Sequence, residues 1–238
     1  MTTVSETSAG TTAADDPRPA ATARGEQTRR LIVDTALRLF REQGYGRTTM
    51  RAIAREAGVA VGNAYYYFPS KEHLVQEFYL GVQAEHRAAA AATLRAETSF
   101  AARLRAVLHA GIDVNAPYHA FAATFFKTAA EPDSPLSPFS AESAEPRRAA
   151  VGMFREVVEG STARVDRELR GELPELLWLA YLGVILYWVH DRSPGQARTR
   201  TLIDGAVPLI DRLVALSRVP GLRAVTREVL GLIRSLRQ

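Results

Sequence analysis

Three residues that stop helices divide the segment from residue 26 to residue 75 into short helical pieces. The first apolar stripe of helical period ends at Gly44, the second ends at Gly58, and the third ends at Pro69. Glycine takes the left-handed conformation that closes a helix, and proline cannot continue one. Two short helices that follow a longer one and meet at a glycine-containing turn predict a helix-turn-helix unit.

The basic residues of the chain are concentrated in the same segment. Residues 24–73 carry nine Lys and Arg side chains against five Asp and Glu side chains, and the whole chain has a net charge of +4. A basic unit at one end of a nearly neutral body favours a polyanionic partner, because neutralised phosphates supply most of the non-specific affinity for nucleic acid.

The third short helix has two different sides on a helical wheel. Its inward stripe is small and apolar: Val61, Ala64 and Phe68, with Tyr65 at the margin. Its outward side is polar or aromatic: Gly62, Asn63, Tyr66 and Tyr67. An amide suits the edge of adenine, and a tyrosine hydroxyl suits a phosphate oxygen. A helix cannot bury three adjacent tyrosines on one side, so DNA contact is favoured over the alternative that they fill a core or an interface.

The residues of this segment resemble a known family. The pattern T-T-x3-I-A-x2-A-G-V-x2-G-x2-Y-x-Y-F-x-S-K-E-x-L, from Thr48 to Leu74, resembles the DNA-binding domain of TetR-family transcriptional regulators. The resemblance covers about residues 26–75, a fifth of the chain. It departs from the usual pattern at Ala60 and Ala64, where the family often has Ser and Leu.

The resemblance implies three groups of DNA contacts. A group at the start of the second helix would hold phosphates: Arg47, Thr48, Thr49 and Arg51. A second group would face the major groove: Ala60, Gly62 and Asn63. A third would hold the backbone beside the groove: Tyr65, Tyr66, Tyr67 and Lys71. Arg24 and Arg29 are further candidates for phosphate or minor-groove contacts.

The rest of the chain is also expected to be helical, since no stretch alternates with the period of a strand. Residues 1–23 lack aromatic residues and are rich in Thr, Ala, Ser, Asp and Pro, which predicts a disordered tail. The fold class is all-α: a three-helix DNA-binding domain with a helix-turn-helix, residues 24–73, joined to a larger helical ligand-binding and dimerisation domain, residues 74–238. Ligand binding and dimerisation are what the resemblance implies. The expected helices run from Ser70 to about Arg95 and over residues 99–113, 117–130, 146–160, 172–191, 196–217 and 221–236.

The resemblance also implies a homodimer that closes through the helices at 172–191 and 196–217. The first of these is apolar nearly all round, so it must be buried on several sides. The alternative is that both helices belong to the core of one chain.

Six side chains of the middle helices are candidates to line a pocket for a small lipophilic or aromatic effector: His109, His119, Phe125, Phe126, Trp178 and Tyr181. Apolar walls with few polar groups are typical of such pockets, although each of these residues could equally be core. His109 and Asp113 have a spacing that metal ligands use, but no third ligand is placed near them, so no metal site is predicted.

Several classes of protein are not expected. The chain has no cysteine and no phosphate-binding, dinucleotide-binding, metalloprotease or serine-hydrolase motif, so we predict neither an enzyme nor a cofactor. The apolar run from Leu176 to Val189 is shorter than the roughly 18–20 residues that span a bilayer, and no secretory signal is evident, which favours a cytoplasmic protein without a membrane partner. The sequence therefore predicts a regulator that a small effector releases from a pseudo-palindromic operator. An activator of the same family and a helical scaffold that binds a protein partner stay open as alternatives.

Overall fold

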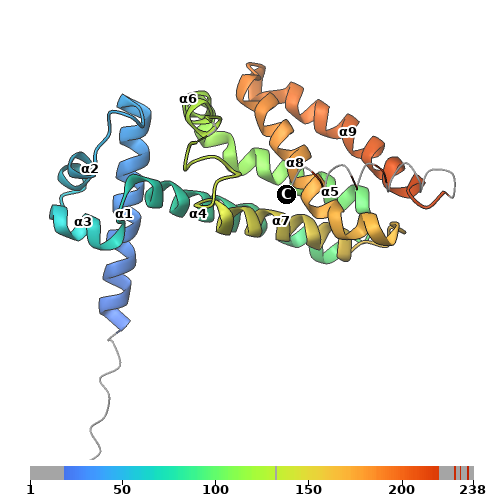
Figure 1. The fold of residues 1–238 in the computed structure, drawn as a ribbon, viewed down its shortest axis with the longest axis horizontal. Coiled ribbons are helices and arrows are strands. Elements are labelled where there is room, and N and C mark those ends of the chain that lie inside the picture. Colours follow the sequence, from blue (N-terminus) through green and yellow to red (C-terminus); the bar gives the residue numbers. More distant parts are fainter. Residues whose placement is uncertain (1–18, 132, 220–227, 229–230, 232–234, 236–238) are drawn as a thin grey trace, which may run out of the picture.

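The computed structural model describes residues 19–131 and 133–219 and the single residues 228, 231 and 235 (Figure 1). Across these residues the regular structure is helical throughout, with no strand, as the sequence predicts. The expected helix at 221–236 falls almost entirely outside the described residues.

The N-terminal part contains four helices: α1 (Pro19–Gln43), α2 (Met50–Glu56), α3 (Val61–Tyr67) and α4 (Lys71–Ala96). Gly44 and Gly58 have φ angles of 87° and 67°, the left-handed conformation that ends α1 and α2. Thr49 begins α2 because its hydroxyl oxygen accepts a hydrogen bond from the Ala52 amide. The predicted helix-turn-helix unit is confirmed.

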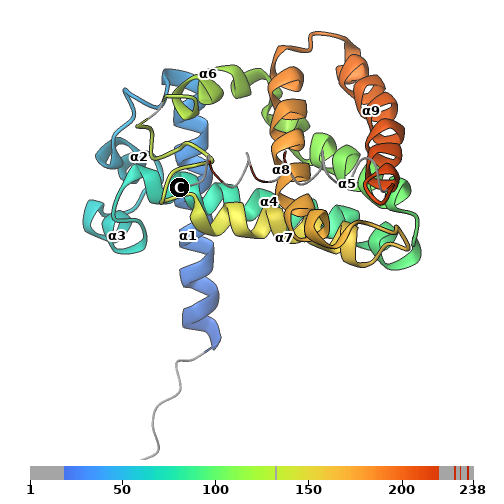
Figure 2. The same cartoon turned by 45° about the vertical axis from the view of Figure 1, so that its right-hand side comes forward.

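Helix α1 is longer than the sequence indicated, since it begins at Pro19 rather than near residue 26. Residues 19–23 are therefore helical, and the prediction of a tail over residues 1–23 is wrong for them; residues 1–18 lie outside the described part. The added turns of α1 extend beyond α2 and α3, away from the rest of the molecule (Figures 1 and 2).

The larger part contains five helices: α5 (Phe100–Asn115), α6 (His119–Ala129), α7 (Ala144–Glu159), α8 (Arg167–His190) and α9 (Ala197–Leu216). Short 3-10 turns, Ala116–Tyr118 and Pro194–Gln196, lead into α6 and α9. The predicted helices are confirmed, although α8 begins five residues before the expected start. α4 runs from the N-terminal unit along the base of the larger part, next to α7 (Figure 2).

Helix α8 is long and apolar enough to cross a membrane by length and composition alone, which the shorter run from Leu176 to Val189 did not indicate. In the fold α8 packs against α7 and α9, and Leu177, Trp178 and Trp188 belong to the main apolar core. Core packing accounts for only part of this composition, because Leu179, Leu186 and Tyr187 of α8 stay exposed.

A buried arginine joins the ends of two helices in the larger part. The Arg103 guanidinium on α5 donates hydrogen bonds to the backbone carbonyls of Leu94 and Glu97, where α4 ends. It also donates to the carbonyls of Glu156 and Val157 in the last turn of α7. The last carbonyls of a helix have no intrahelical partner and carry partial negative charge, so one cation satisfies both helix ends.

A buried carboxylate organises the connection between α8 and α9. Asp191 accepts hydrogen bonds from the amide and hydroxyl of Ser193 and from the amide and hydroxyl of Thr199, at distances from 2.6 to 2.9 Å. Burial alone would raise the pKa of Asp191, but these four hydrogen bonds lower it well below its usual range. The charged form of Asp191 thus stabilises the turn that sets the direction of α9.

We expect Arg103→Met to lower the free energy of unfolding by about 2–4 kcal/mol, because it leaves buried carbonyls at two helix ends without a donor. The matched control is Arg105→Met, on the same helix, which removes only an exposed ion pair with Asp204 and should cost about 1 kcal/mol or less. Urea denaturation at one protein concentration measures both. Equal losses for the two variants would contradict the role of Arg103.

We expect Asp191→Asn to lower stability at pH 7 by about 1–3 kcal/mol, because the amide replaces a charged acceptor of four hydrogen bonds. Since the folded pKa lies below the unfolded value of about 3.9, the contribution of Asp191 is complete above that value and is lost as the pH falls below it. The difference between wild type and variant should therefore shrink below about pH 4. Asp34→Asn, at an exposed position of α1, is the matched control in denaturant titrations from pH 7 to pH 3.

Candidate DNA-binding surface and ligand cavity

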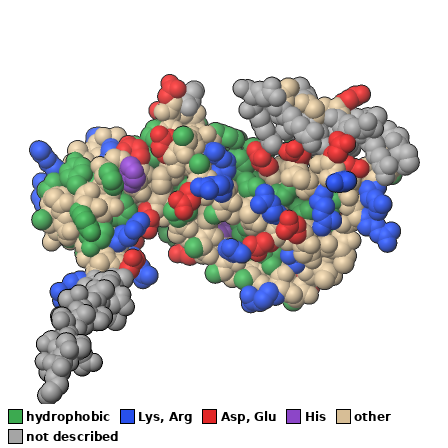
Figure 3. Space-filling view, turned by 60° about the horizontal axis from the view of Figure 1, so that its bottom comes forward, with side chains coloured by type: hydrophobic (Ala, Val, Ile, Leu, Met, Phe, Trp, Pro, Cys, Tyr) green, Lys and Arg blue, Asp and Glu red, His purple; other side chains and the backbone are tan. Residues whose placement is uncertain are grey.

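The outward side of α3 is exposed, as the helical wheel predicts for most of its residues. Gly62 and Asn63 are exposed, and the Tyr66 side chain is 81% exposed. Ala64 and Phe68 are buried in the core of the N-terminal unit together with Ile32. Val61, predicted on the same inward stripe, is instead 39% exposed, because it begins α3 at the edge of this core. The end of the molecule that carries α1–α3 presents apolar and Lys/Arg side chains on one face (Figure 3, left).

The tyrosines of α3 differ from the wheel in two places. Tyr65, expected at the core margin, is 46% exposed, whereas Tyr67, expected to point outward, is half-buried and packs against the core. The reason is the added length of α1: a Cβ atom placed on Gly25 would lie 3.5 Å from the Tyr67 hydroxyl. The added turns therefore cover Tyr67 and leave Tyr65 and Tyr66 as the exposed pair.

The predicted phosphate contacts at α2 divide into buried and exposed residues. The Thr48 side chain is fully buried and donates a hydrogen bond to the Gly44 carbonyl (2.9 Å), so the prediction that it contacts phosphate is wrong. Thr49 is exposed at the N-terminus of α2, where Arg51 is also exposed. Arg47 is exposed and its Nε donates to the Gln43 carbonyl. Arg47, Thr49 and Arg51 therefore remain candidates for phosphate contact.

Lys71 is folded back onto the turn after α1. Its Nζ donates to the Tyr45 carbonyl (2.8 Å) and lies 4.3 Å from the centre of the Tyr45 ring. Partial burial lowers the pKa of Lys71. The Tyr45 hydroxyl in turn donates to Glu72 (2.7 Å); burial would raise the pKa of Glu72, but this bond and one from Ser70 lower it overall. In this structure Lys71 joins α4 to α1 rather than extending outward as predicted.

Arg29 is also held within the protein. Its guanidinium forms an ion pair with Glu77 of α4 (2.6 Å) and lies 5.3 Å from the centre of the Phe68 ring. The suggested DNA contact of Arg29 is therefore not supported, whereas Arg24 is exposed on the added turns of α1.

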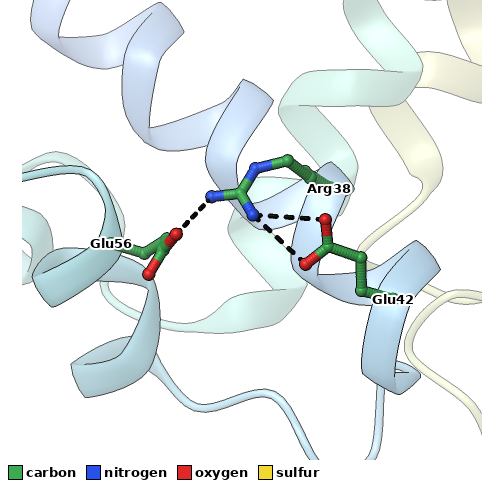
Figure 4. A network of polar contacts seen from close by, with 3 residues as sticks. All are labelled: Arg38, Glu42 and Glu56. Carbon is green, nitrogen blue, oxygen red and sulfur yellow. Dashed lines mark hydrogen bonds and ion pairs between the residues drawn. The ribbon is translucent and has the colours of Figure 1, made fainter.

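Arg38 positions α2 on α1 (Figure 4). Its guanidinium binds Glu42 on its own helix (3.1 Å) and Glu56 at the end of α2 (2.8 Å). An acidic residue at the C-terminal end of a helix opposes the helix dipole, and the arginine offsets that charge. These ion pairs join α1 to the end of α2, the helix on which α3 packs.

A cavity of about 720 Å³ lies in the larger part, between α4, α6, α7 and α8. Four of the six predicted pocket residues line it: Phe125, Phe126, Trp178 and Tyr181. Most of its wall is aromatic or aliphatic, which is typical of sites for small lipophilic molecules.

The two predicted histidines lie outside the cavity lining. His109 binds Asp204 of α9 (3.0 Å), so it joins α5 to α9. The His119 Nε2 donates to the Trp188 carbonyl (2.8 Å) and therefore joins α6 to α8, two of the helices that form the cavity wall. Asp113 forms an ion pair with Arg200, and no cluster of metal-binding side chains occurs in the described part of the chain.

Sequence reasoning missed the contribution of α4 to the cavity. Phe78, Tyr79, Val82 and Gln83 line it from the middle of α4. Their spacing of three and four residues was a visible signal for one face of a helix. What this face meets depends on α6 and α8, which are distant in the sequence.

A helix-turn-helix unit at the N-terminal end of a purely helical chain, with a cavity in its larger part, defines a helix-turn-helix transcription regulator. Within that class the chain matches two family models. One, described as "Tetracyclin repressor-like, C-terminal domain", matches residues 103–232, more than half of the chain, and the other, "Bacterial regulatory proteins, tetR family", matches residues 32–78. The chain belongs to the TetR family of transcriptional regulators.

Individual relatives agree with this assignment. The HTH-type transcriptional repressor KstR of Rhodococcus jostii is 48% identical over 50 residues, which are 21% of this chain and 24% of KstR. The matched stretches span between 17% and 32% of the curated relatives' own lengths.

Two solved structures share the fold at low sequence identity. The TetR transcriptional regulator from Nitrosomonas europaea is 16% identical with a TM-score of 0.60, and the alignment covers 77% of this chain and 97% of that one. FadR from Bacillus subtilis, solved in complex with stearoyl-CoA, is 16% identical with a TM-score of 0.59, covering 75% of this chain and 96% of that one.

Proposed function

We propose that the protein is a repressor that dimerises on a pseudo-palindromic operator and is released when a small lipophilic effector fills the cavity. The observation that carries the proposal is packing shared by the two parts of the molecule. Phe125 and Ala129 line the cavity and also belong to the apolar core of the DNA-binding unit, together with Leu136 of the next loop. A molecule in the cavity therefore touches side chains on which the helix-turn-helix unit rests.

Hydrogen bonds reinforce this packing at α4. The Tyr79 hydroxyl donates to the Leu136 carbonyl (3.2 Å), and Gln76 donates to the Pro135 carbonyl (3.0 Å). The Tyr79 and Phe125 rings meet edge to face with centres 5.7 Å apart. Because α4 also carries Lys71 at its start, a shift of α6 and its loop would be passed through α4 to the Tyr45 turn between α1 and α2.

The release mechanism is a shift of population between two conformations. An effector that binds one conformation more tightly favours it by the ratio of its two affinities. If that conformation places the two recognition helices of a dimer away from a separation of about 34–36 Å, operator affinity falls, since successive major grooves are no longer matched.

The dimer interface that we propose is formed by α8 and α9. Both helices keep large apolar side chains exposed on one stripe: Leu179, Leu186 and Tyr187 on α8, and Leu202, Leu209, Leu213 and Leu216 on α9. Large exposed apolar patches are typical of protein interfaces. The stripes fall on the helices that the sequence indicated for dimerisation, 172–191 and 196–217.

On the DNA side, we propose that Ala60, Gly62 and Asn63, all exposed, face the major groove, where Asn63 reads bases. We assign phosphate contacts to Thr49, Tyr65 and Tyr66. The exposed amide of Asn63 suits adenine, and the two exposed phenols lie on the same helix beside it. Arg47 and Arg51 supply positive charge at the start of α2. This set is narrower than the sequence prediction because Thr48, Tyr67 and Lys71 are engaged within the protein.

We expect Asn63→Ala to relax base preference at one position of each half-site by about 1–3 kcal/mol, because the only base-reading amide of α3 is removed. Tyr66→Phe keeps the ring and removes the hydroxyl, so it should weaken binding to all sequences alike. Selection from random duplexes, followed by titration at several salt concentrations, distinguishes the two effects. Unchanged preference in Asn63→Ala would refute base reading, and indifference of the wild type to DNA at low salt would refute the proposed function.

We expect Leu213→Asp to convert the dimer into a monomer, because it places a charge in an apolar interface. Leu213 is 67% exposed in the single chain, so the folded monomer should tolerate the change. Leu31→Asp is the matched control, since Leu31 is an exposed leucine (46%) on α1, far from α8 and α9. Sedimentation equilibrium measures both; a Leu213→Asp protein that stays dimeric would contradict the assigned interface.

A further inference from the structure

The cavity of the larger part reaches the molecular surface beside α8. Among the described residues that line it, six are exposed, and they come from two places. Three belong to the end of α6 and the loop after it, and three belong to α8: Ala130, Glu131 and Phe139, then Leu179, Gly183 and Leu186. Pockets for small ligands usually bury most of the ligand surface. A lipophilic molecule in the single chain would instead keep part of its apolar surface in water.

The three exposed lining residues of α8 form one ridge of the helix. Leu179, Gly183 and Leu186 are spaced four and three residues apart, so they lie above one another on successive turns. On one side of this ridge the residues of α8 line the cavity, and on the other side Ala180 and Tyr187 are exposed. Along this ridge the cavity wall therefore borders directly on the apolar stripe that α8 presents to solvent.

The exposed stripe of α8 is symmetric about Gly183. Leu179 and Tyr187 lie four residues to either side of it, and Ala180 and Leu186 lie three residues to either side. With a two-fold axis beside Gly183, an antiparallel copy of α8 would set Leu179 against the partner's Tyr187 and Ala180 against the partner's Leu186. Two-fold interfaces are self-complementary in this way, so the stripe suits a second copy of the same chain.

Gly183 leaves room for two helices to cross closely. A Cβ atom placed on it would meet no heavy atom within 4 Å, so nothing in the described part of the chain requires a glycine at this position. Its backbone is helical, and glycine in the middle of a helix is less stable than alanine. The close approach of a second backbone accounts for a glycine here.

We propose that α8 of a second copy crosses at Gly183 and closes the cavity, so that both protomers bury each effector molecule. The inference rests on the proposed function, which takes the cavity as the effector site and α8 with α9 as the dimer interface; it adds that the two form one site. Such coupling is reciprocal: dimerisation tightens effector binding, and each bound effector tightens the dimer by the same factor. Removing roughly 55 Å² of apolar ligand surface from water corresponds to about a tenfold change in affinity.

A fluorescent lipophilic probe tests this with the full-length protein. N-phenyl-1-naphthylamine is uncharged and becomes fluorescent in apolar surroundings, and energy transfer from Trp178 and Trp188, which line the cavity, selects probe bound near them. The monomeric variant Leu213→Asp changes a residue of α9 that is not among the described lining residues. We expect it to bind the probe at least about tenfold more weakly than the wild-type dimer. The dimeric control Leu31→Asp should bind the probe as the wild type does.

Two glycine variants test the crossing point. Gly183→Leu places a side chain where the helices meet and should weaken dimerisation at least about tenfold. The matched control is Gly171→Leu on the same helix, where an added Cβ atom also meets nothing within 4 Å. Gly171 lies off the stripe, so this variant should dimerise as the wild type does. Sedimentation equilibrium measures both, with circular dichroism to confirm helical folding; a Gly183→Leu protein that dimerises as tightly as the wild type would overturn the crossing at Gly183.

The reciprocal measurement uses the wild type alone. Saturating probe should lower the dissociation constant of the dimer at least about tenfold, because two sites are completed when it forms. A dissociation constant that the probe does not change, or equal probe affinity in the wild-type dimer and monomeric Leu213→Asp, would overturn the inference. Closure of the cavity would then belong to the chain's own residues, including those after residue 219.

Operator binding measured in the same samples separates this inference from the proposed function. Probe binding that is linked to dimerisation but does not release DNA would support the shared site and refute release by the effector. Release of DNA together with equal probe affinity in monomer and dimer would overturn the inference alone. A wild type that stays monomeric would overturn both.

Discussion

Leu136, in the loop after α6, is completely buried in the same apolar cluster as Ile32, Ile53 and Phe68 of the N-terminal helices. The helix-turn-helix unit thus completes its core with side chains that arrive from more than sixty residues further along the chain. Three short helices bury little apolar surface by themselves, so this contact is a condition for their stability as well as a connection between the two parts. The DNA-binding unit and the larger part have separate apolar cores, and Phe125, Ala129 and Leu136 of the larger part belong to the core of the DNA-binding unit.

Polar contacts along α4 also connect the DNA-binding unit to the larger part of the molecule. At its start Lys71 and Glu72 form hydrogen bonds with Tyr45 in the turn after α1. Five residues further on, Glu77 forms an ion pair with Arg29, and at the end of α4 the Leu94 and Glu97 carbonyls accept hydrogen bonds from Arg103. These contacts reach α1 at one end and α5 and α7 at the other. In the proposed release mechanism, these contacts would carry a displacement at the middle of α4, where the cavity lies, to its start.

The sequence was sufficient to predict the helix-turn-helix unit because Gly44, Gly58 and Pro69 are local signals that act whatever surrounds them. It was also sufficient to place Phe125 and Trp178 near a cavity, since helical period and apolar character are visible in one dimension. The sequence was not sufficient to place Thr48 and Lys71. Their residue types suit phosphate contact, but in the structure their side chains form hydrogen bonds within the protein. That Gln83 and Trp188 line the same cavity depends on how α4 and α8 face each other, and no local pattern encodes that.

The added turns of α1 have a consequence for the shape of the recognition surface. Seven residues, Pro19 to Gly25, precede the expected start of α1, and at 1.5 Å per residue they lengthen it by about 10 Å. Part of that length covers Tyr67. Shortening α1 past Gly25 would uncover a third phenol at the end of α3, so the length of one helix sets how many tyrosines its neighbour presents.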